Sequence, residues 1–441
     1  MLQTRALTQA PIIKTLTLTS LPNIVGLLAL IGSALIDTLF VSWISTQALT
    51  AVSYTFVLVL FVGAIAKGLG TALSAHYGRA IGKQNTTQAR RLFDNAILMT
   101  WLISSLVAVA GLWSIAPLFG FLGASSDVLP LIRDYMMYWY LGVPLLMLIM
   151  VGNKGLRCLG DAKTPAKVML AAAAINTILD PILIFGLGPA PELGIAGASI
   201  ATTISWAAAL AWSAIHWRKD AQWLEPCNNS WRKLCLDWRR FIAIAQPSSL
   251  TALLQPAVNT GIIAVLARLD ESAVAAFGVA VRIESFLLIG VNGLATALAP
   301  FIAANLGAGQ KLRAHSALMQ SLFGCLAIQA LVVLPVVLFA TPIARVFSDD
   351  PQVVHWLSFY LKLVPLAYGF LGVVILFAQA LNAYRKPLQA LTLNLSRTLL
   401  IMIPLMIIGQ SMYGVAGLLL ALPLANALAG GVSLFLAWRM R

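Results

Sequence analysis

Residues 16–43 read LTLTSLPNIVGLLALIGSALIDTLFVSW, an apolar run that carries one charged side chain, that of Asp37. A helix rises 1.5 Å per residue, so about 20 apolar residues cross the roughly 30 Å of hydrocarbon in a bilayer. The run is longer than the core of a signal peptide, and no obvious small-residue cleavage site follows it. We therefore interpret it as a retained membrane-spanning helix.

Comparable runs recur along the chain, which has 441 residues, 60% of them hydrophobic and 10% charged. A soluble domain carries about 25% charged residues. Lipid-exposed backbone must satisfy its own hydrogen bonds, which makes these runs helices. We predict an all-α polytopic membrane protein with twelve transmembrane helices, at about 16–43, 49–75, 92–118, 129–153, 166–187, 194–217, 240–268, 273–300, 315–345, 354–382, 389–409 and 414–438.

Basic residues cluster in alternate connections between the predicted spans. By the positive-inside rule, these connections and both termini face the cytoplasm, and we expect a bacterial inner membrane. The net charge of +14 does not indicate nucleic-acid binding, because the clusters are short and carry no recognition motif. The residues assigned to the cytoplasmic connections include Arg79, Lys83, Arg90, Arg91, Lys154, Arg157, Lys163, Lys167, Arg218, Lys219, Arg385 and Lys386.

The two halves of the chain resemble each other at an offset of about 220 to 225 residues. The motif Gly194-Ile195-Ala196-Gly197 recurs as Gly414-Val415-Ala416-Gly417, and Pro165 recurs as Pro387. We divide the chain into a first lobe (1–217), a cytoplasmic linker (218–239) and a second lobe (240–441). Six helices in each half make a parallel repeat, and transporters of this kind bind substrate between the lobes.

Two carboxylates lie inside the spans of the first lobe at similar depth. Asn176 precedes Asp180 by one helical turn on the same face, and Asp37 lies at a similar distance from the outer end of its own span. Thr202 and Thr203 reach nearly the same level. An ionisable residue within a span marks function by default, although a buried Asp can also simply fix helix packing. We found no basic residue at that depth in this lobe, since Lys67 lies nearer the cytoplasmic end, so such a pair could take up and release protons.

Further residues have both a functional and a structural interpretation. Pro22 and Pro181 could act as hinges or as ordinary packing prolines. Aromatic and sulfur side chains of the 129–153 span could line a substrate pocket or form an interfacial belt. The candidates for substrate lining are Tyr138, Tyr140, Met147 and Asn259.

The second lobe lacks the carboxylate that the repeat would place there. Asn259 is the counterpart of Asp37 at an offset of 222 residues, so ion coupling is expected to belong to the first lobe. Glu284 and Arg282 lie in one span but on different helical faces, and we favour a structural role for both.

These features resemble the MATE family of multidrug and toxic compound extrusion antiporters, and within it the DinF-like branch. The resemblance covers the whole chain and includes Lys67-Gly68-Leu69-Gly70, the turn at 159–165 and Asn305-Leu306-Gly307-Ala308-Gly309. It implies a V-shaped pair of six-helix lobes that exports varied, often cationic or amphipathic, compounds against inward flow of H⁺ or Na⁺. The acidic cluster of that branch carries over onto Asp37, Asn176 and Asp180, with its hydroxyl on Thr202 or Thr203.

We therefore expect a secondary antiporter, driven by H⁺ through Asp37 and Asp180, that acts as a monomer on small drugs or toxins without an organic cofactor or a resident metal. Na⁺ at Asp37, Asn176 and Asp180 stays open as the coupling ion. A flippase for lipid-linked precursors is a second alternative, but it would need more Arg and Lys within the spans than we predict here. An enzyme using Mg²⁺ and aspartates would need several carboxylates at the cytoplasmic ends, and a passive channel does not suit midspan acids in a two-lobe repeat.

Overall fold

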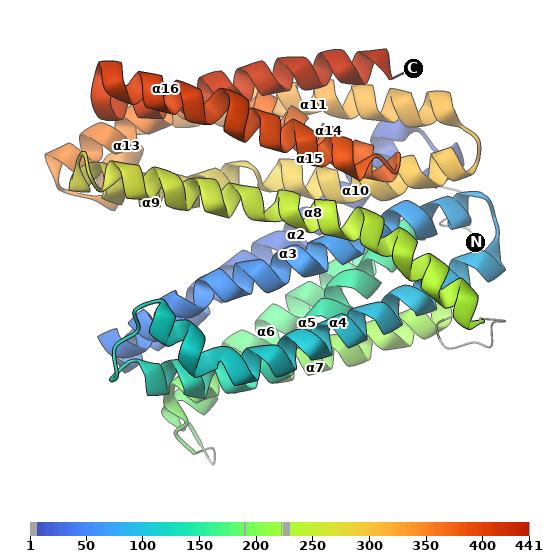
Figure 1. The fold of residues 1–441 in the computed structure, drawn as a ribbon, viewed down its shortest axis with the longest axis horizontal. Coiled ribbons are helices and arrows are strands. Elements are labelled where there is room, and N and C mark those ends of the chain that lie inside the picture. Colours follow the sequence, from blue (N-terminus) through green and yellow to red (C-terminus); the bar gives the residue numbers. More distant parts are fainter. Residues whose placement is uncertain (1–6, 189–190, 222, 224–229, 441) are drawn as a thin grey trace.

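The structure, a computed structural model, describes residues 7–188, 191–221, 223 and 230–440. Within these ranges every regular element is a helix, and there is no β-strand. Two bundles pack side by side (Figure 1). The first lobe comprises α2 (Ile12–Ile44), α3 (Thr46–Gly82), α4 (Thr86–Phe121), α5 (Leu129–Cys158), α6 (Lys163–Phe185) and α7 (Gly194–Asp220). The second comprises α8 (Trp231–Leu266), α9 (Glu271–Leu287), α10 (Ile289–Gly307), α11 (Lys311–Leu338), α12 (Ala340–Phe347), α13 (Pro351–Leu363), η1 (Val364–Ala367), α14 (Tyr368–Ala383), α15 (Pro387–Leu395), η2 (Ser396–Met402) and α16 (Ile403–Arg439).

Twelve spans account for these elements, which confirms the predicted fold class. Among the described residues, eleven helical segments are long and apolar enough to cross a membrane. The last of them, 387–439, holds two spans, because Gly414 has a non-helical backbone (φ 60°, ψ −133°) at which the chain reverses. The eighth span is α9 followed by α10, interrupted at Leu288.

The repeated glycine motif has the same geometry in both lobes. Gly194 and Gly414 both have positive φ, +53° and +60°, a conformation that favours glycine. Three residues later, a Cβ on Gly197 would overlap the carbonyl of Leu183, and a Cβ on Gly417 would overlap that of Gly409. Each motif thus combines a turn with a close backbone crossing of the last two helices of its lobe.

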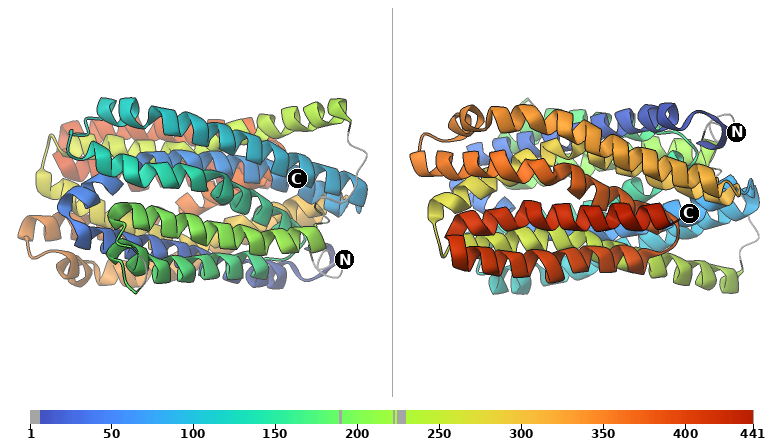
Figure 2. Two further views of the ribbon diagram at one scale, coloured as in Figure 1. Left: turned by 90° about the horizontal axis from the view of Figure 1, so that it is seen from below. Right: turned by 90° about the horizontal axis from the view of Figure 1, so that it is seen from above.

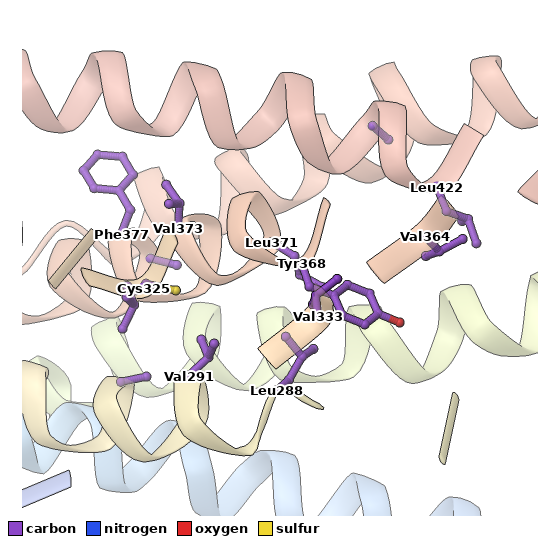
Figure 3. Close-up of a cluster of buried hydrophobic side chains, with 14 of the residues drawn as sticks. Leu288, Val291, Cys325, Val333, Val364, Tyr368, Leu371, Val373, Phe377 and Leu422 are labelled. Atoms are coloured by element: carbon purple, nitrogen blue, oxygen red, sulfur yellow. The ribbon is translucent and has the colours of Figure 1, made fainter. Parts of the chain in front are cut away.

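Each lobe has its own hydrophobic core. In the second lobe, side chains from α10, α11, α14 and α16 interdigitate, among them Val291, Cys325, Phe377 and Leu422 (Figure 3). The core of the first lobe lies mainly among α3, α4 and α5. The two cores meet at the boundary between the lobes, because Leu16 of α2 belongs to the cluster of the second lobe and Phe241 of α8 to that of the first.

The lobes touch through backbone at the end that carries both termini (Figures 1 and 2). A Cβ on Gly82 of α3 would overlap the carbonyl of Ala304 in α10, and one on Gly307 of α10 would overlap the carbonyl of Arg79. Arg79 also donates a hydrogen bond from Nη2 to the carbonyl of Ala383, 3.1 Å away. Toward the opposite end the ribbons of the two bundles draw apart in Figure 1. The structure is therefore closed at the end that bears the termini.

The first helix of the second lobe is anchored to the first lobe. Asp237 of α8 is buried and accepts hydrogen bonds from Arg91 Nε and Asn95 Nδ2 of α4, each at 3.0 Å. Helix α8 begins at Trp231, so residues 231–239 of the predicted linker are helical. Residues 222 and 224–229 of that linker lie outside the described residues.

Candidate functional site

The predicted polar residues of the first lobe form one hydrogen-bonded cluster around Asn176. Asn176 Nδ2 donates to Asp180 Oδ1 at 2.9 Å and approaches Thr202 Oγ1 at 3.3 Å. Its Oδ1 accepts a hydrogen bond of 2.7 Å from Ser33 Oγ of α2. The amide therefore connects α2, α6 and α7, as helical spacing along α6 predicts.

Asp37 and Asp180 each have one buried oxygen that accepts no hydrogen bond in the described part of the chain. These atoms are Oδ1 of Asp37 and Oδ2 of Asp180, and the Asp180 side chain is fully buried. The negative charge of Asp37 also acts on Asp180, so the two carboxylates lie near each other. Buried polar atoms are nearly always paired, so an unpaired oxygen on each of two neighbouring carboxylates indicates a place for a proton or a small cation.

The structure separates the two threonines. Thr202 belongs to the cluster, whereas Thr203 Oγ1 donates a 3.0 Å hydrogen bond to the carbonyl of Tyr138 and faces α5. Sequence reasoning missed two neighbours. Ser33 lies one turn before Asp37 on the same face of α2, and the buried Tyr135 of α5 is close enough for the charges of both carboxylates to act on it. The i, i+4 spacing of Ser33 and Asp37 was a usable signal.

Both candidate hinge prolines lie inside continuous helices. Pro22 lies in α2 and Pro181 in α6, and neither helix has a non-helical residue there. Each proline leaves the carbonyl four residues earlier without its usual backbone donor. Their hinge role stays a prediction.

A cavity of about 460 Å³ lies between the lobes, on the terminal side of the carboxylate cluster. Its lining comes from α2, α3, α5, α6 and α7 of the first lobe and from α9, α10 and α14 of the second. Three of the lining residues are basic and none is acidic. Its polar side chains are Asn23, Lys67, Thr71, Asn153, Lys154, Arg157, Trp206, Ser285, Asn292, Thr296 and Gln379.

The three basic residues are Lys67 of α3 and Lys154 and Arg157 of α5. The positive charges of Lys67 and Arg157 both act on Lys154, so the three lie close together. Asn23 Oδ1 of α2 accepts a 2.8 Å hydrogen bond from Arg157 Nε. We call Lys67, Lys154 and Arg157 the basic triad.

The placement of Lys154 and Arg157 in a connection was wrong. Helix α5 continues to Cys158, which puts both side chains in its last turns and against the cavity.

The other predicted lining residues do not contact this cavity. Met147 is fully buried, and Tyr140 packs against Gly111 of α4, both within the first lobe. The carbonyl of Tyr138 accepts from Thr203, and Asn259 Oδ1 accepts a 3.1 Å hydrogen bond from Gln255. None of these four residues is part of the cavity lining.

The second lobe repeats the polar cluster with a different charge. At the repeat offset of 222 residues, Gln255 corresponds to Ser33 and Asn259 to Asp37. Arg397 Nη2 donates to Gln255 Oε1 at 3.0 Å, and Nη1 donates to Asn426 Oδ1 at 2.7 Å. A buried guanidinium thus lies where the first lobe has an amide and two carboxylates.

Glu284 lies near this guanidinium. Its Oε2 accepts hydrogen bonds from Tyr360 at 3.0 Å and Tyr368 at 3.1 Å, and the charge of Arg397 acts on it. Arg282, in contrast, is exposed. Arg397 lies in the π-helical segment η2, and π turns are frequent at functional positions in helices.

Comparison with known proteins identifies relatives over the whole chain. The family model described as MatE matches twice, at residues 22–182 and 247–408, once in each lobe. A protein of Shewanella oneidensis named "FAD transporter" is 48% identical over 434 residues, which is 98% of this chain and 96% of the relative. The multidrug export protein MepA of Staphylococcus haemolyticus is 24% identical over 98% of this chain and 95% of its own. The crystal structure of the Vibrio cholerae MATE transporter VcmN in the bent form has a TM-score of 0.91 and 28% identity, covering 100% of this chain and 98% of that one.

Proposed function

Because this chain belongs to the MATE family of membrane transporters, we propose that it is a secondary antiporter that exports a flavin dinucleotide in exchange for protons. It is a multi-pass membrane protein and a transporter, not an enzyme. One observation carries the choice of substrate, namely that the cavity between the lobes contains three basic residues and no acidic one. A flavin dinucleotide has an anionic pyrophosphate between two flat rings, and the relative at 48% identity is named for FAD.

The same observation disfavours the cationic drugs that the resemblance implied. A cation entering this cavity would meet like charges without an opposing carboxylate, which costs free energy in a site of low dielectric constant. Multidrug export, the activity in the names of relatives at 24% identity, is the second candidate for the uncharged or anionic compounds that the cavity would accept.

We favour H⁺ over Na⁺ as the coupling ion because of the orientation of the Asn176 side-chain amide. Its NH₂ group donates toward both Asp180 and Thr202, because its oxygen is already used by Ser33. A bound Na⁺ needs oxygens turned toward it, so it would compete with this amide for the same acceptors. A proton needs only the oxygen of Asp37 or Asp180 that accepts no hydrogen bond. Na⁺ at Asp37, Asn176 and Asp180 is the alternative, and an imposed Na⁺ gradient tests it.

Helix α2 provides the connection between ion and substrate. It carries Ser33 and Asp37 in its outer half and Asn23, the partner of Arg157, in its inner half, about 20 Å away at 1.5 Å per residue. Protonation would by itself add positive charge and strengthen the binding of an anion. The coupling must therefore act through a change of conformation that the proton stabilises, and Pro22, next to Asn23, is the proposed hinge.

We place both termini in the cytoplasm of a bacterial inner membrane, and the end that bears them is the closed one. Each monomer encloses its own cavity between its two lobes, so no second copy is required. Export of an anion moves negative charge out of a cell whose interior is negative, which contributes about 2.3 kcal/mol per charge per 100 mV. An inside-negative membrane potential therefore favours both the inward movement of protons and the outward movement of the anion.

Proteoliposomes with an imposed pH gradient test this function. Wild-type protein should accumulate FAD, followed by its fluorescence, on the side that supplies protons, whereas Asp37→Asn should not. Asp127→Asn, an exposed loop carboxylate, is the matched control and should behave as wild type. Accumulation of ethidium but not FAD by the wild type would overturn the choice of substrate. Accumulation driven by Na⁺ alone would overturn the choice of ion.

A further inference from the structure

We propose that the basic triad, Lys67, Lys154 and Arg157, is a phosphate-binding site that holds the pyrophosphate of the transported molecule. This inference rests on the proposed function and adds the residues that recognise the substrate. The ligand class is an organic phosphate or diphosphate that also carries a flat ring.

The basic triad meets no acidic side chain in the cavity lining, and Asp161, which lies outside the lining, acts on Arg157. Among the residues that the structure describes, Lys67, Lys154 and Arg157 form no ion pair. The Nζ atoms of both lysines also have no hydrogen-bond partner there. Neighbouring positive charges inside a membrane protein repel one another, so they cost folding free energy unless an anion joins them. A phosphate supplies the missing charge and several acceptor oxygens.

The side chains are held in place rather than loosely disposed. The stem of Lys154 crosses Gly70, where an added Cβ would lie 3.1 Å from its Cγ. Gly70 thus provides the space in which Lys154 lies, one helical turn from Lys67 on α3. Asn23 orients Arg157 through Nε, which leaves Nη1 and Nη2 for a ligand, since Nη2 has only the weak acceptor Met169 Sδ at 3.7 Å. An arginine whose Nε is held by a hydrogen bond presents its two terminal NH₂ groups in a fixed orientation, which suits the binding of a phosphate.

The remaining lining fits the rest of such a molecule. Trp206 of α7 borders the cavity with Leu146, Ile149 and Met150, which gives a flat ring an aromatic and apolar surface. Asn292 and Gln379 contribute amides from the second lobe. A molecule held at the triad would thus contact both lobes, as a substrate must if its release depends on their relative movement.

Binding of flavins that differ in phosphate content tests the site. The purified full-length protein is titrated with FAD and with riboflavin, and inorganic pyrophosphate serves as a competitor. Lys67→Met and Lys154→Met should each weaken FAD binding about tenfold or more, the loss expected for one charge-assisted contact. Riboflavin lacks phosphate, so its binding should be the same in wild type and variants.

Lys163→Met removes an exposed lysine at the start of α6 and should leave FAD binding unchanged. Lys154→Arg should retain most of it. The methionine variants keep the apolar stem, and riboflavin binding reports whether they fold. Unchanged FAD binding in both Lys67→Met and Lys154→Met, or wild-type binding of FAD that pyrophosphate does not reduce, would overturn the site.

The outcomes separate this inference from the proposed function. FAD accumulation by the wild type together with full FAD binding in both lysine variants would retain the function and reject the site. No FAD accumulation, together with pyrophosphate binding that requires both lysines, would retain the site and reject the flavin as its substrate.

Discussion

Arg397 in the second lobe occupies the repeat position of Asn176 in the first, 221 residues earlier. Each side chain binds the two neighbours that the repeat places beside it. Asn176 bonds Ser33 and Thr202, whereas Arg397 bonds Gln255 and Asn426. The second lobe therefore carries a built-in cation where the first lobe has two carboxylates that can take one up. Under the proposed function, the first lobe responds to the coupling ion, and the second lobe has a fixed charge state.

The fixed charge of Arg397 predicts that its replacement lowers the stability of the protein but leaves the coupling of transport to pH unchanged. Arg397→Gln should lower the melting temperature, because it leaves the acceptors of Gln255 and Asn426 short of a donor in a buried site, at about 1–3 kcal/mol each. Thermal unfolding in detergent measures this, with the exposed Arg282→Gln as control. FAD accumulation per folded molecule should keep its dependence on external pH. A loss of that dependence would show that the second lobe takes part in proton coupling.

Neutralising the carboxylates should separate binding from coupling. Asp37→Asn and Asp180→Asn remove the proton site but leave the basic triad intact. FAD affinity should stay within about twofold of wild type, whereas acceleration of efflux by external acid should disappear. Equilibrium titration and proteoliposome flux measure the two quantities. Weakened FAD binding in both variants would place the substrate at the carboxylates instead.

The two threonines should respond differently. Thr202→Val removes the hydroxyl beside Asn176 and should shift the pH dependence of efflux. Thr203→Val removes a hydrogen bond to the Tyr138 carbonyl and should cost about 1 kcal/mol of stability with no shift in pH dependence. Flux measured across a pH series compares them. Equal pH profiles for both variants would contradict the assignment of Thr202 to the cluster.

The closed end depends on glycine at the crossing of α3 and α10. Gly82→Ala would place a methyl group against the carbonyl of Ala304 and should hold the lobes apart there. We expect increased labelling of a cysteine introduced nearby and a slower transport cycle. Gly63→Ala lies on the same helix in open space and is the matched control. Identical labelling in the two variants would mean that this contact does not close the end that bears the termini.

FAD efflux should also depend on voltage. Both the outward anion and the inward proton move net positive charge into the cell, so an inside-negative potassium diffusion potential should speed efflux, and reversing it should slow efflux. Efflux that is indifferent to the potential would require an electroneutral exchange and would contradict an anionic substrate.

Helical spacing and depth were sufficient to find part of the site. Asn176 and Asp180 are four residues apart, and charges within spans are so costly that Asp37 and Asp180 are conspicuous in the sequence. Two members of the basic triad, Lys154 and Arg157, were not found, because the positive-inside rule assigns basic residues near a span end to a loop, and Lys67 was placed within a span but not in the site. Lys154 and Arg157 satisfy that rule and also face the cavity. Ser33 was missed because hydroxyls are common in spans, and Arg397 because its partners lie on two other helices.

The contact of Gly82 with Ala304 and of Gly307 with Arg79 has a consequence for energy conservation. Main chain lies directly against main chain at both contacts, so the helices themselves must move for the lobes to separate there. Under the proposed function, a proton bound at Asp37 would therefore pass to the end that bears the termini only when these helices rearrange. In the proposed antiport, this contact would limit the leakage of protons through the transporter between transport cycles.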